Sequence, residues 1–277
     1  MSTEKKGKGS SPAGKKKLPR KELIRRIVMG VLIVVAAGSL GYFAFYSGEA
    51  EQTEQKFNKL SSLKNTNFTL FQPKTVKVDE PDAPPEILED YITLYNKNKS
   101  LIGWLKIDDT IIDYPVMQSQ NMEYYLDHNF SQEKDRNGCL FADKDCSIWP
   151  RSTNIIIYGH NMKSGKMFGS LTKYKSEDYF KKHPMIQFDT IYEKGTYAVM
   201  YVFSEVVHEE TEVAFKYYQF IDANSAEEYD SYMQDMAEMS LYDTGVTSHI
   251  GDQLITLSTC DYVKGGERWV VVAKRVE

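Results

Sequence analysis

Short apolar runs recur between residues 102 and 275, and turn residues separate them. Most of these runs are rich in Val, Ile, Tyr and Thr, the residue types that favour strands. Eight runs at this spacing predict a mainly β domain, closed into a barrel or stacked as a sandwich. The predicted strands cover residues 102–107, 110–117, 139–142, 154–158, 185–191, 196–207, 253–259 and 268–275.

Helical patterns lie before and between these runs. An N-terminal surface helix is predicted from residue 86 onward, because apolar residues at 87, 88, 91, 92 and 95 share one helical face. A longer helix, residues 226–239, lies inside the connection before the last two strands, and Ser225 with Glu228 forms a capping box at its start. Insertions of this kind on a β scaffold are often functional. Short peripheral helices are predicted at residues 121–126, 167–174 and 177–182.

Residues 27–46 form a run of 20 residues without a charge. About 20 apolar residues span a bilayer core as a helix. Tyr42 and Tyr46 suit the membrane interface at the far end of this run, and the Lys and Arg before it predict a cytoplasmic N-terminus. A cleaved signal peptide is the alternative, with Ala44 and Ser47 as small residues near a cleavage site. The length of the run favours an uncleaved single-pass anchor, with everything after it outside the cell.

Charge divides the 277-residue chain into unlike parts. Its net charge is −5, yet residues 1–26 carry ten Lys and Arg against two Glu. No aromatic residues interleave these basic ones, so the arm is interpreted as a topology signal and no nucleic-acid binding is expected. Four prolines near the end of residues 47–85 favour an extended stalk. The predicted organisation is therefore a cytoplasmic tail (1–26), a transmembrane anchor (27–46), an extracellular stalk (47–85) and a folded domain (86–277).

Three residues with reactive side chains stand at the ends of predicted strands. Cys260 ends the run LITLSTC, His160 ends NIIIYGH, and Arg268 opens the last strand. A thiolate is a strong nucleophile, an imidazole can protonate a leaving amine, and a guanidinium can stabilise an oxyanion. If the three meet at one rim of the sheet, they can perform acyl transfer through a thioester. Taken singly, such a cysteine is usually a small buried apolar residue, and such a histidine is usually an ordinary surface or core residue.

Several sequence blocks resemble sortases, the cysteine transpeptidases of Gram-positive bacterial surfaces. TLSTC with Arg eight positions later, and IIIYGHNMKSGKMFGSL around the histidine, carry this resemblance. The blocks GWLKIDDTIIDYPVMQ and YYLDHNF, together with the helix-bearing insertion, look most like class B sortases. The resemblance covers residues 86–277. It implies an eight-stranded sortase-type β-barrel, an N-terminal membrane anchor and a catalytic domain outside the cell.

The same resemblance assigns roles to the three residues. It implies that Cys260 attacks a Thr–Gly or Thr–Asn type bond in the C-terminal sorting signal of a surface protein. It makes His160 the general acid and then the base, and Arg268 the group that positions substrate and stabilises the oxyanion. The acceptor is then an amine of a peptidoglycan cross-bridge or a pilin. A monomeric catalytic domain without a cofactor is expected.

Further groove residues follow from the resemblance by position. Ser258 matches a substrate-lining position, and Asn121, Leu126 and parts of residues 217–232 are candidates to line the groove, with ordinary packing as an equal alternative. Asp261 is a candidate to orient His160 or Arg268. The position of such an acidic residue varies in class B enzymes, and the gap from Cys260 to Arg268 looks short beside some relatives.

Other signals do not change this interpretation. Cys139 and Cys146 lie outside the cell in the predicted topology, and two free thiols are favoured over a disulfide. No His or Cys pair has the spacing of a structural zinc site, so no metal is expected. Two other functions stay open from the sequence: a non-catalytic anchored β-domain that acts in binding or assembly, and a hydrolytic cysteine protease in which water takes the place of the amine.

Overall fold

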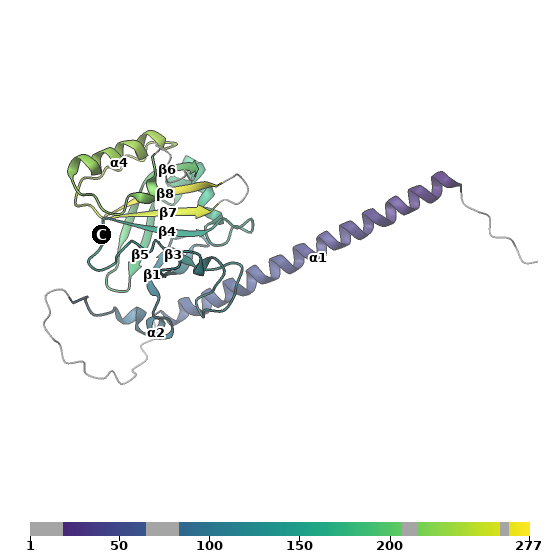
Figure 1. Cartoon of the computed structure of the whole chain (residues 1–277), viewed down its shortest axis with the longest axis horizontal. Coiled ribbons are helices and arrows are strands. Elements are labelled where there is room, and N and C mark those ends of the chain that lie inside the picture. The colour runs from purple at the N-terminus through teal and green to yellow at the C-terminus, as the bar shows by residue number, and fades with distance from the viewer. Residues whose placement is uncertain (1–18, 65–82, 207–214, 261–265) are drawn as a thin grey trace, which may run out of the picture. The chain divides into compact units, whose positions relative to one another are not determined.

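The β-strands of the protein close into a barrel. The computed structural model describes residues 19–64, 83–206, 215–260 and 266–277. Within these ranges the strands follow the order β1-β2-β3-β4-β7-β8-β6-β5 around the barrel. Figure 1 shows β4, β7, β8 and β6 side by side. The strands are β1 (Leu101–Lys106), β2 (Asp113–Gln118), β3 (Leu140–Ala142), β4 (Asn154–His160), β5 (Met185–Thr190), β6 (Thr196–Val206), β7 (Leu254–Cys260) and β8 (Glu267–Arg275).

The predicted mainly β fold with eight strands is confirmed, and each strand lies within a few residues of its predicted range. Strands β4 and β7 form the apolar centre, with Ile155, Ile156, Ile157, Ile255 and Leu257 at 0% exposure. They pair in parallel, whereas β7 pairs with β8 in the antiparallel sense. Parallel pairs are covered on both faces, which explains why these strands are almost continuously apolar.

Helices surround the barrel. α2 (Glu89–Lys97) buries Tyr91 and Leu94, as the predicted apolar face requires. The connection from β6 to β7 carries α4 (Ala226–Met239), which packs near β6 (Figure 1). Tyr229, Met233 and Met236 of α4 join a hydrophobic cluster with Val270 and Val272 of β8. The remaining short helices are η1 (Tyr124–Leu126), η2 (Gly169–Lys175), α3 (Glu177–Lys182) and η3 (Tyr217–Gln219).

Ser225 caps α4, as predicted. Its side chain accepts a hydrogen bond from the backbone N–H of Glu228 at 3.2 Å. The reciprocal half of the capping box differs from the prediction, because the Glu228 carboxylate accepts from the backbone N–H of Asn224 at 2.8 Å. Two N–H donors at the helix start are still satisfied, so the insertion holds a stable helix.

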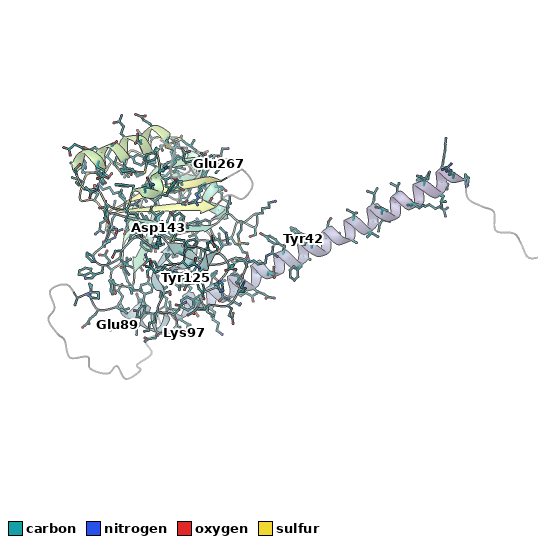
Figure 2. All side chains as sticks on the ribbon, in the orientation of Figure 1. Tyr42, Glu89, Lys97, Tyr125, Asp143 and Glu267 are labelled. Atoms are coloured by element: carbon teal, nitrogen blue, oxygen red, sulfur yellow. The ribbon has the colours of Figure 1, made fainter. Side chains whose placement is uncertain are left out.

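Near the start of the described residues lies one long helix, α1 (Arg20–Leu63), which contains the apolar run. Its length and hydropathy suffice to cross a membrane. Apolar and aromatic side chains along it stand exposed, as Tyr42 does at 64% exposure (Figure 2). The chain divides into two compact units, one ending at Gly48 and the other formed by Glu49–Glu277.

The expected stalk, residues 47–85, starts as helix. Residues 49–63 of α1 belong to the same compact unit as the barrel. Phe57 is 2% exposed and meets the Tyr114 ring edge-on with centroids 5.1 Å apart, and Thr53 is 5% exposed. Residues 65–82, with part of the expected proline-rich spacer, lie outside the described residues.

Candidate functional site

The ends of β4 and β7 bring two of the predicted site residues together. In the parallel pairing the Cα partners run from Asn154 with Leu254 to His160 with Cys260. The histidine and the cysteine are therefore directly paired where both strands end. The sequence placed each residue at a strand end but could not show that these two strands are neighbours.

Arg268 stands at the same rim. In the antiparallel pairing of β7 with β8, Ser258 faces Val270. Continuing this register by two residues on each strand brings Cys260 opposite Arg268. The backbone N–H of Trp269 donates to the Thr259 hydroxyl at 3.4 Å, which shows that the two strands are still adjacent here.

Strand alternation predicts which face these residues share. On β4, Asn154 donates to the Phe220 carbonyl at 2.8 Å, so this face of the strand looks toward the connection that bears α4. Because alternate residues of a strand share one face, Tyr158 and His160 lie on the same face as Asn154. On β7, Ser258 bonds to Tyr217 of the same connection at 2.9 Å. The insertion thus borders the face on which the candidate site lies.

His160 has a fixed hydrogen-bond partner. Its Nε2 lies 2.6 Å from the Leu126 carbonyl oxygen, at the end of η1. A carbonyl oxygen has no proton to donate, so Nε2–H must be the donor. Proton exchange with a reacting group is then left to Nδ1. Leu126, predicted as a groove residue, therefore acts on the site through its backbone.

Arg268 lies against an aromatic ring. Its Cζ is 5.4 Å from the ring centroid of Tyr158, a distance typical of a cation–π contact. The Tyr158 hydroxyl donates to the Asp143 carboxylate at 3.0 Å. Burial, and then the charge of Asp143, raise the pKa of Tyr158 well above its ordinary value. Tyr158 is not among the residues predicted from the sequence, although its place two residues before His160 on one strand was a usable signal.

The other predicted groove residues lie in different surroundings. Ser258 is fully buried, with its hydroxyl bonded to Tyr217. Asn121 is exposed, and its side chain accepts from the backbone N–H of Glu123 at 3.0 Å. Asp261 lies outside the described residues. Ser258 therefore presents no exposed surface in this structure, and Tyr217 holds its hydroxyl.

Gly159, between Tyr158 and His160, is required by close packing. A Cβ atom there would lie 2.5 Å from Leu140 Cδ2 and 2.8 Å from Phe168 Cδ2. Such contacts are far inside van der Waals distance. Because Gly159 has no side chain, Leu140 of β3 and Phe168, just before η2, can pack directly against the end of β4 that carries His160.

Cys139 and Cys146 are buried free thiols. Burial raises the pKa of Cys139, and burial raises the pKa of Cys146 to about 12. Neither has the electropositive, accessible surroundings of a reactive cysteine. Within the described parts of the chain, no three His, Cys, Asp or Glu side chains gather in a way that would hold a metal ion.

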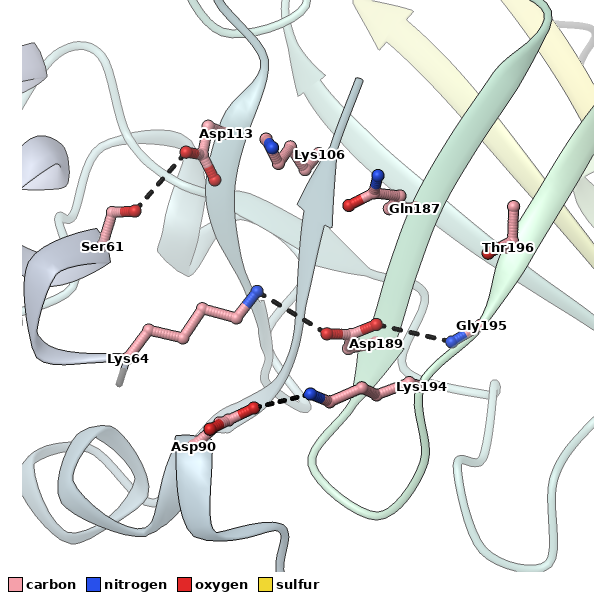
Figure 3. A pocket seen from close by; sticks show the side chains of 10 residues that line it. All are labelled: Ser61, Lys64, Asp90, Lys106, Asp113, Gln187, Asp189, Lys194, Gly195 and Thr196. Atoms are coloured by element: carbon pink, nitrogen blue, oxygen red, sulfur yellow. Dashed lines mark hydrogen bonds and ion pairs between the residues drawn. The ribbon is translucent and has the colours of Figure 1, made fainter. Parts of the chain in front are cut away.

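A cavity of about 390 Å³ lies elsewhere. Its lining includes Lys106 at the end of β1 and Thr196 at the start of β6, whereas the site borders the far end of β6, where Glu205 pairs with Arg268. Figure 3 shows ion pairs across it, from Lys64 to Asp189 at 3.6 Å and from Lys194 to Asp90 at 2.8 Å. Its charged groups are largely satisfied by one another, so it is not the candidate site.

Comparisons with known proteins agree with this geometry. The model of the Sortase domain family matches residues 105–276. Sortase B of Listeria monocytogenes is 37% identical over 196 residues, which cover 69% of this chain and 76% of that protein. Sortase B from Bacillus anthracis, solved in complex with AAEK1, aligns with a TM-score of 0.68 at 30% identity, covering 83% of this chain and 98% of that one. A Staphylococcus aureus sortase B–substrate complex aligns with a TM-score of 0.69 at 26% identity, with the same coverage.

The fold is a closed barrel in which a cysteine and a histidine are paired at one rim, and the family model matches more than half of the chain. The chain therefore belongs to the sortase family of cysteine transpeptidases. Its relatives in sequence and structure place it among the class B sortases.

Proposed function

We propose that this chain is a membrane-anchored class B sortase in which Cys260 is the nucleophile, His160 the acid and base, and Arg268 the oxyanion-stabilising group. The observation that supports this most strongly is the direct pairing of His160 with Cys260 at the ends of β4 and β7. The substrate is a surface protein with a C-terminal sorting motif, cleaved at a Thr–Gly or Thr–Asn type bond. The acceptor is an amine of a peptidoglycan cross-bridge or a pilin.

In the first step the Cys260 thiolate attacks the threonine carbonyl carbon, and a C–S bond forms. The oxyanion of the tetrahedral intermediate is stabilised by the Arg268 guanidinium. The intermediate collapses as the C–N bond breaks, and His160 donates its Nδ1 proton to the leaving nitrogen. The products are a thioester on Cys260 and the free amino end of the released fragment.

In the second step an amine attacks the thioester carbonyl. The now neutral His160 accepts the amine proton at Nδ1, and the C–S bond breaks to restore the thiolate. Throughout both steps Nε2–H stays bonded to the Leu126 carbonyl at 2.6 Å, which keeps the ring orientation constant. A new amide links the surface protein to the acceptor.

Two contacts support the role of Arg268. The Tyr158 ring lies under its guanidinium, and Asp143 holds the Tyr158 hydroxyl. A preorganised guanidinium loses little energy to reorganisation when charge develops on the substrate. Groove-lining roles for Ser258, Asn121 and Leu126, and a role for Asp261 in orienting His160 or Arg268, belong to the same proposal.

The proposed location is the cell membrane. The apolar part of α1, residues 27–46, crosses the bilayer once, with the basic residues 1–26 in the cytoplasm and the catalytic domain outside. The catalytic domain acts as a monomer on its substrates.

The test uses the full chain in detergent with a sorting-motif peptide and triglycine. Cys260→Ala and His160→Ala are expected to abolish product, and Arg268→Lys to lower kcat by about 10²- to 10³-fold, because a single oxyanion donor contributes on that scale. Product masses separate the amide made with triglycine from the hydrolysed peptide. Cleavage by Cys260→Ala at the wild-type rate would contradict the proposal, and hydrolysis alone would identify a protease.

A further inference from the structure

The part of α1 that packs on the barrel, residues 49–63, is here termed the docked segment. Thr53 and Phe57 are its most buried side chains, at 5% and 2% exposure. It meets two loops of the barrel: residues 127–139, between η1 and β3, and residues 161–168, between β4 and η2. The first loop directly follows Leu126, whose carbonyl bonds to the His160 ring, and the second loop directly follows His160 itself.

The first loop is fastened at Thr53. The Thr53 hydroxyl donates to the Asp135 carboxylate at 2.9 Å and accepts from the Asn137 amide at 2.7 Å. Thr53 and Asn137 are each 5% exposed and Asp135 is half-buried, so this small network is largely shielded from water. Buried and satisfied hydrogen bonds of this kind fix one arrangement of a loop. Two exposed ion pairs, Lys56 with Glu133 and Glu49 with Arg136, lie at its edges and contribute little.

From this loop the connection to His160 is short. The Asp135 N–H donates to the Asp127 carbonyl at 2.9 Å, and the Cys139 N–H donates to the Tyr125 carbonyl at 3.0 Å. These two bonds hold the residues on either side of Leu126. The Leu126 carbonyl is the group that accepts from His160 Nε2.

The second loop follows His160 directly and is fastened at Lys166. Its ammonium pairs with Glu51 at 3.1 Å and with Glu54, and the side chain is 13% exposed. Burial opposes the charge, but the two carboxylates outweigh it and raise the pKa of Lys166. Met167, next to it, is buried and has a φ of +50°. Such a backbone conformation in a residue other than glycine persists only where its surroundings hold it.

This loop closes back on the histidine. The Phe168 N–H donates to the His160 carbonyl at 3.0 Å, and Asn161 and Met167 form a β-bridge. Met162 and Met167 share a small gap with Thr53 and Phe57 of the docked segment. The segment therefore contacts the loop that fixes the backbone of His160 as well as the loop that fixes its ring.

We propose that the docked segment is a positioning element of the active site. It holds both loops so that Nε2–H of His160 stays bonded to Leu126 and Nδ1 is presented to the reaction. Thr53 on the docked segment and Lys166 on the second loop are the positioning residues. This inference rests on the proposed catalytic role of His160. A segment that serves only to connect the barrel to the membrane requires neither a buried hydroxyl network nor a shielded Lys166.

The experiment compares matched variants of the full chain in detergent. Thr53→Val removes the hydroxyl at nearly constant volume, and Lys166→Met removes the charge; Thr53→Ser and Lys166→Arg restore each function. Ser62→Ala and Lys181→Met are controls, because Ser62 is exposed on the same helix and Lys181 pairs only locally with Glu177. Transpeptidation gives kcat and KM, and ¹⁵N NMR follows the exchange of the His160 Nε2 proton.

Thr53→Val with Lys166→Met is expected to lower kcat about tenfold with KM changed less than about twofold, and to speed Nε2 proton exchange by a similar factor. The restoring variants and the controls are expected to match wild type. If the double variant does not fold, the two single variants carry the same comparison. A folded variant with wild-type kcat and proton exchange overturns the inference alone, whereas an active Cys260→Ala enzyme overturns the proposed function.

Discussion

In the proposed mechanism, the carbonyl oxygen of Leu126 decides which nitrogen of His160 takes part in the chemistry. Residue types and strand ends only suggested Cys260, His160 and Arg268, and the resemblance of the surrounding sequence blocks to sortases assigned them their predicted roles. The sequence could not reveal the contact with Leu126, because every residue has a backbone carbonyl and the residue type does not indicate which carbonyl accepts the bond. The cation–π contact of Tyr158 with Arg268 could not be predicted either, because it depends on β4 and β8 lying on the two sides of β7.

Tyr158 offers a test of how Arg268 is held. Tyr158→Phe keeps the ring under the guanidinium and loses only the bond to Asp143, so kcat/KM is expected to fall less than about threefold. Tyr158→Leu removes the ring and is expected to lower kcat/KM by about tenfold, the scale of a partly desolvated cation–π contact. Equal rates for wild type and Tyr158→Leu would show that the ring does not position Arg268.

The buried thiols make a prediction about pH. The thiolate is the reactive form, and burial raises the pKa of Cys146 to about 12, with a raised pKa for Cys139 as well. Between pH 7 and 9 both therefore stay protonated in the folded protein, and iodoacetamide is expected to modify Cys260 only. In urea their pKa values return to about 8.5 and all three react. Peptide mass mapping that finds Cys139 or Cys146 modified as fast as Cys260 in the native protein would contradict this.

At the scale of elements, the sequence predicted strands and α4 well because alternation, helical spacing and capping are local. The boundaries of α4 match residue for residue, since Ser225 marks its start chemically. β4 ends at His160, two residues beyond its predicted end. The additional part includes Gly159, a residue type that is uncommon in strands and is required here because Phe168 packs so closely. The pairing order of the barrel depends on long-range contacts, and no local pattern encodes it.

The cap of α4 has a measurable stability. Ser225→Ala removes the hydrogen bond to the Glu228 N–H and is expected to lower the free energy of unfolding by about 0.5–2 kcal/mol. Ser176→Ala is the matched control, because Ser176 precedes α3 without a side-chain cap bond. Urea unfolding of the full chain gives both values. Equal losses for the two variants would show that the Ser225 hydroxyl does not stabilise the helix.

At the scale of the whole molecule, the apolar run and its charged flank were recognisable from the sequence alone. The packing of residues 49–63 on the barrel could not be recognised from the sequence. Its two buried residues, Thr53 and Phe57, do not form an apolar stripe along the helix. Their partners, Asp135, Asn137 and Tyr114, come from distant parts of the chain. The expected spacer thus begins with residues that belong to the catalytic unit.

Membrane topology is tested on cells that produce the full chain. The protein is expected to stay in the membrane pellet after alkaline carbonate extraction, since an uncharged 20-residue helix leaves a bilayer reluctantly. Protease added outside is expected to remove the catalytic domain, and the intact mass is expected to include residues 1–46. A soluble protein that begins near Ser47 would instead identify a cleaved signal peptide.

The central claim is that a thiol, an imidazole and a guanidinium at one rim of the barrel perform acyl transfer. Intact-mass analysis of the full chain mixed with a sorting-motif peptide, without an amine, tests it most directly. The predicted result is a mass increase equal to the acyl fragment, located on Cys260 by peptide mapping and lost on addition of hydroxylamine or triglycine. An acyl group on another residue, or rapid cleavage by Cys260→Ala, would contradict the account.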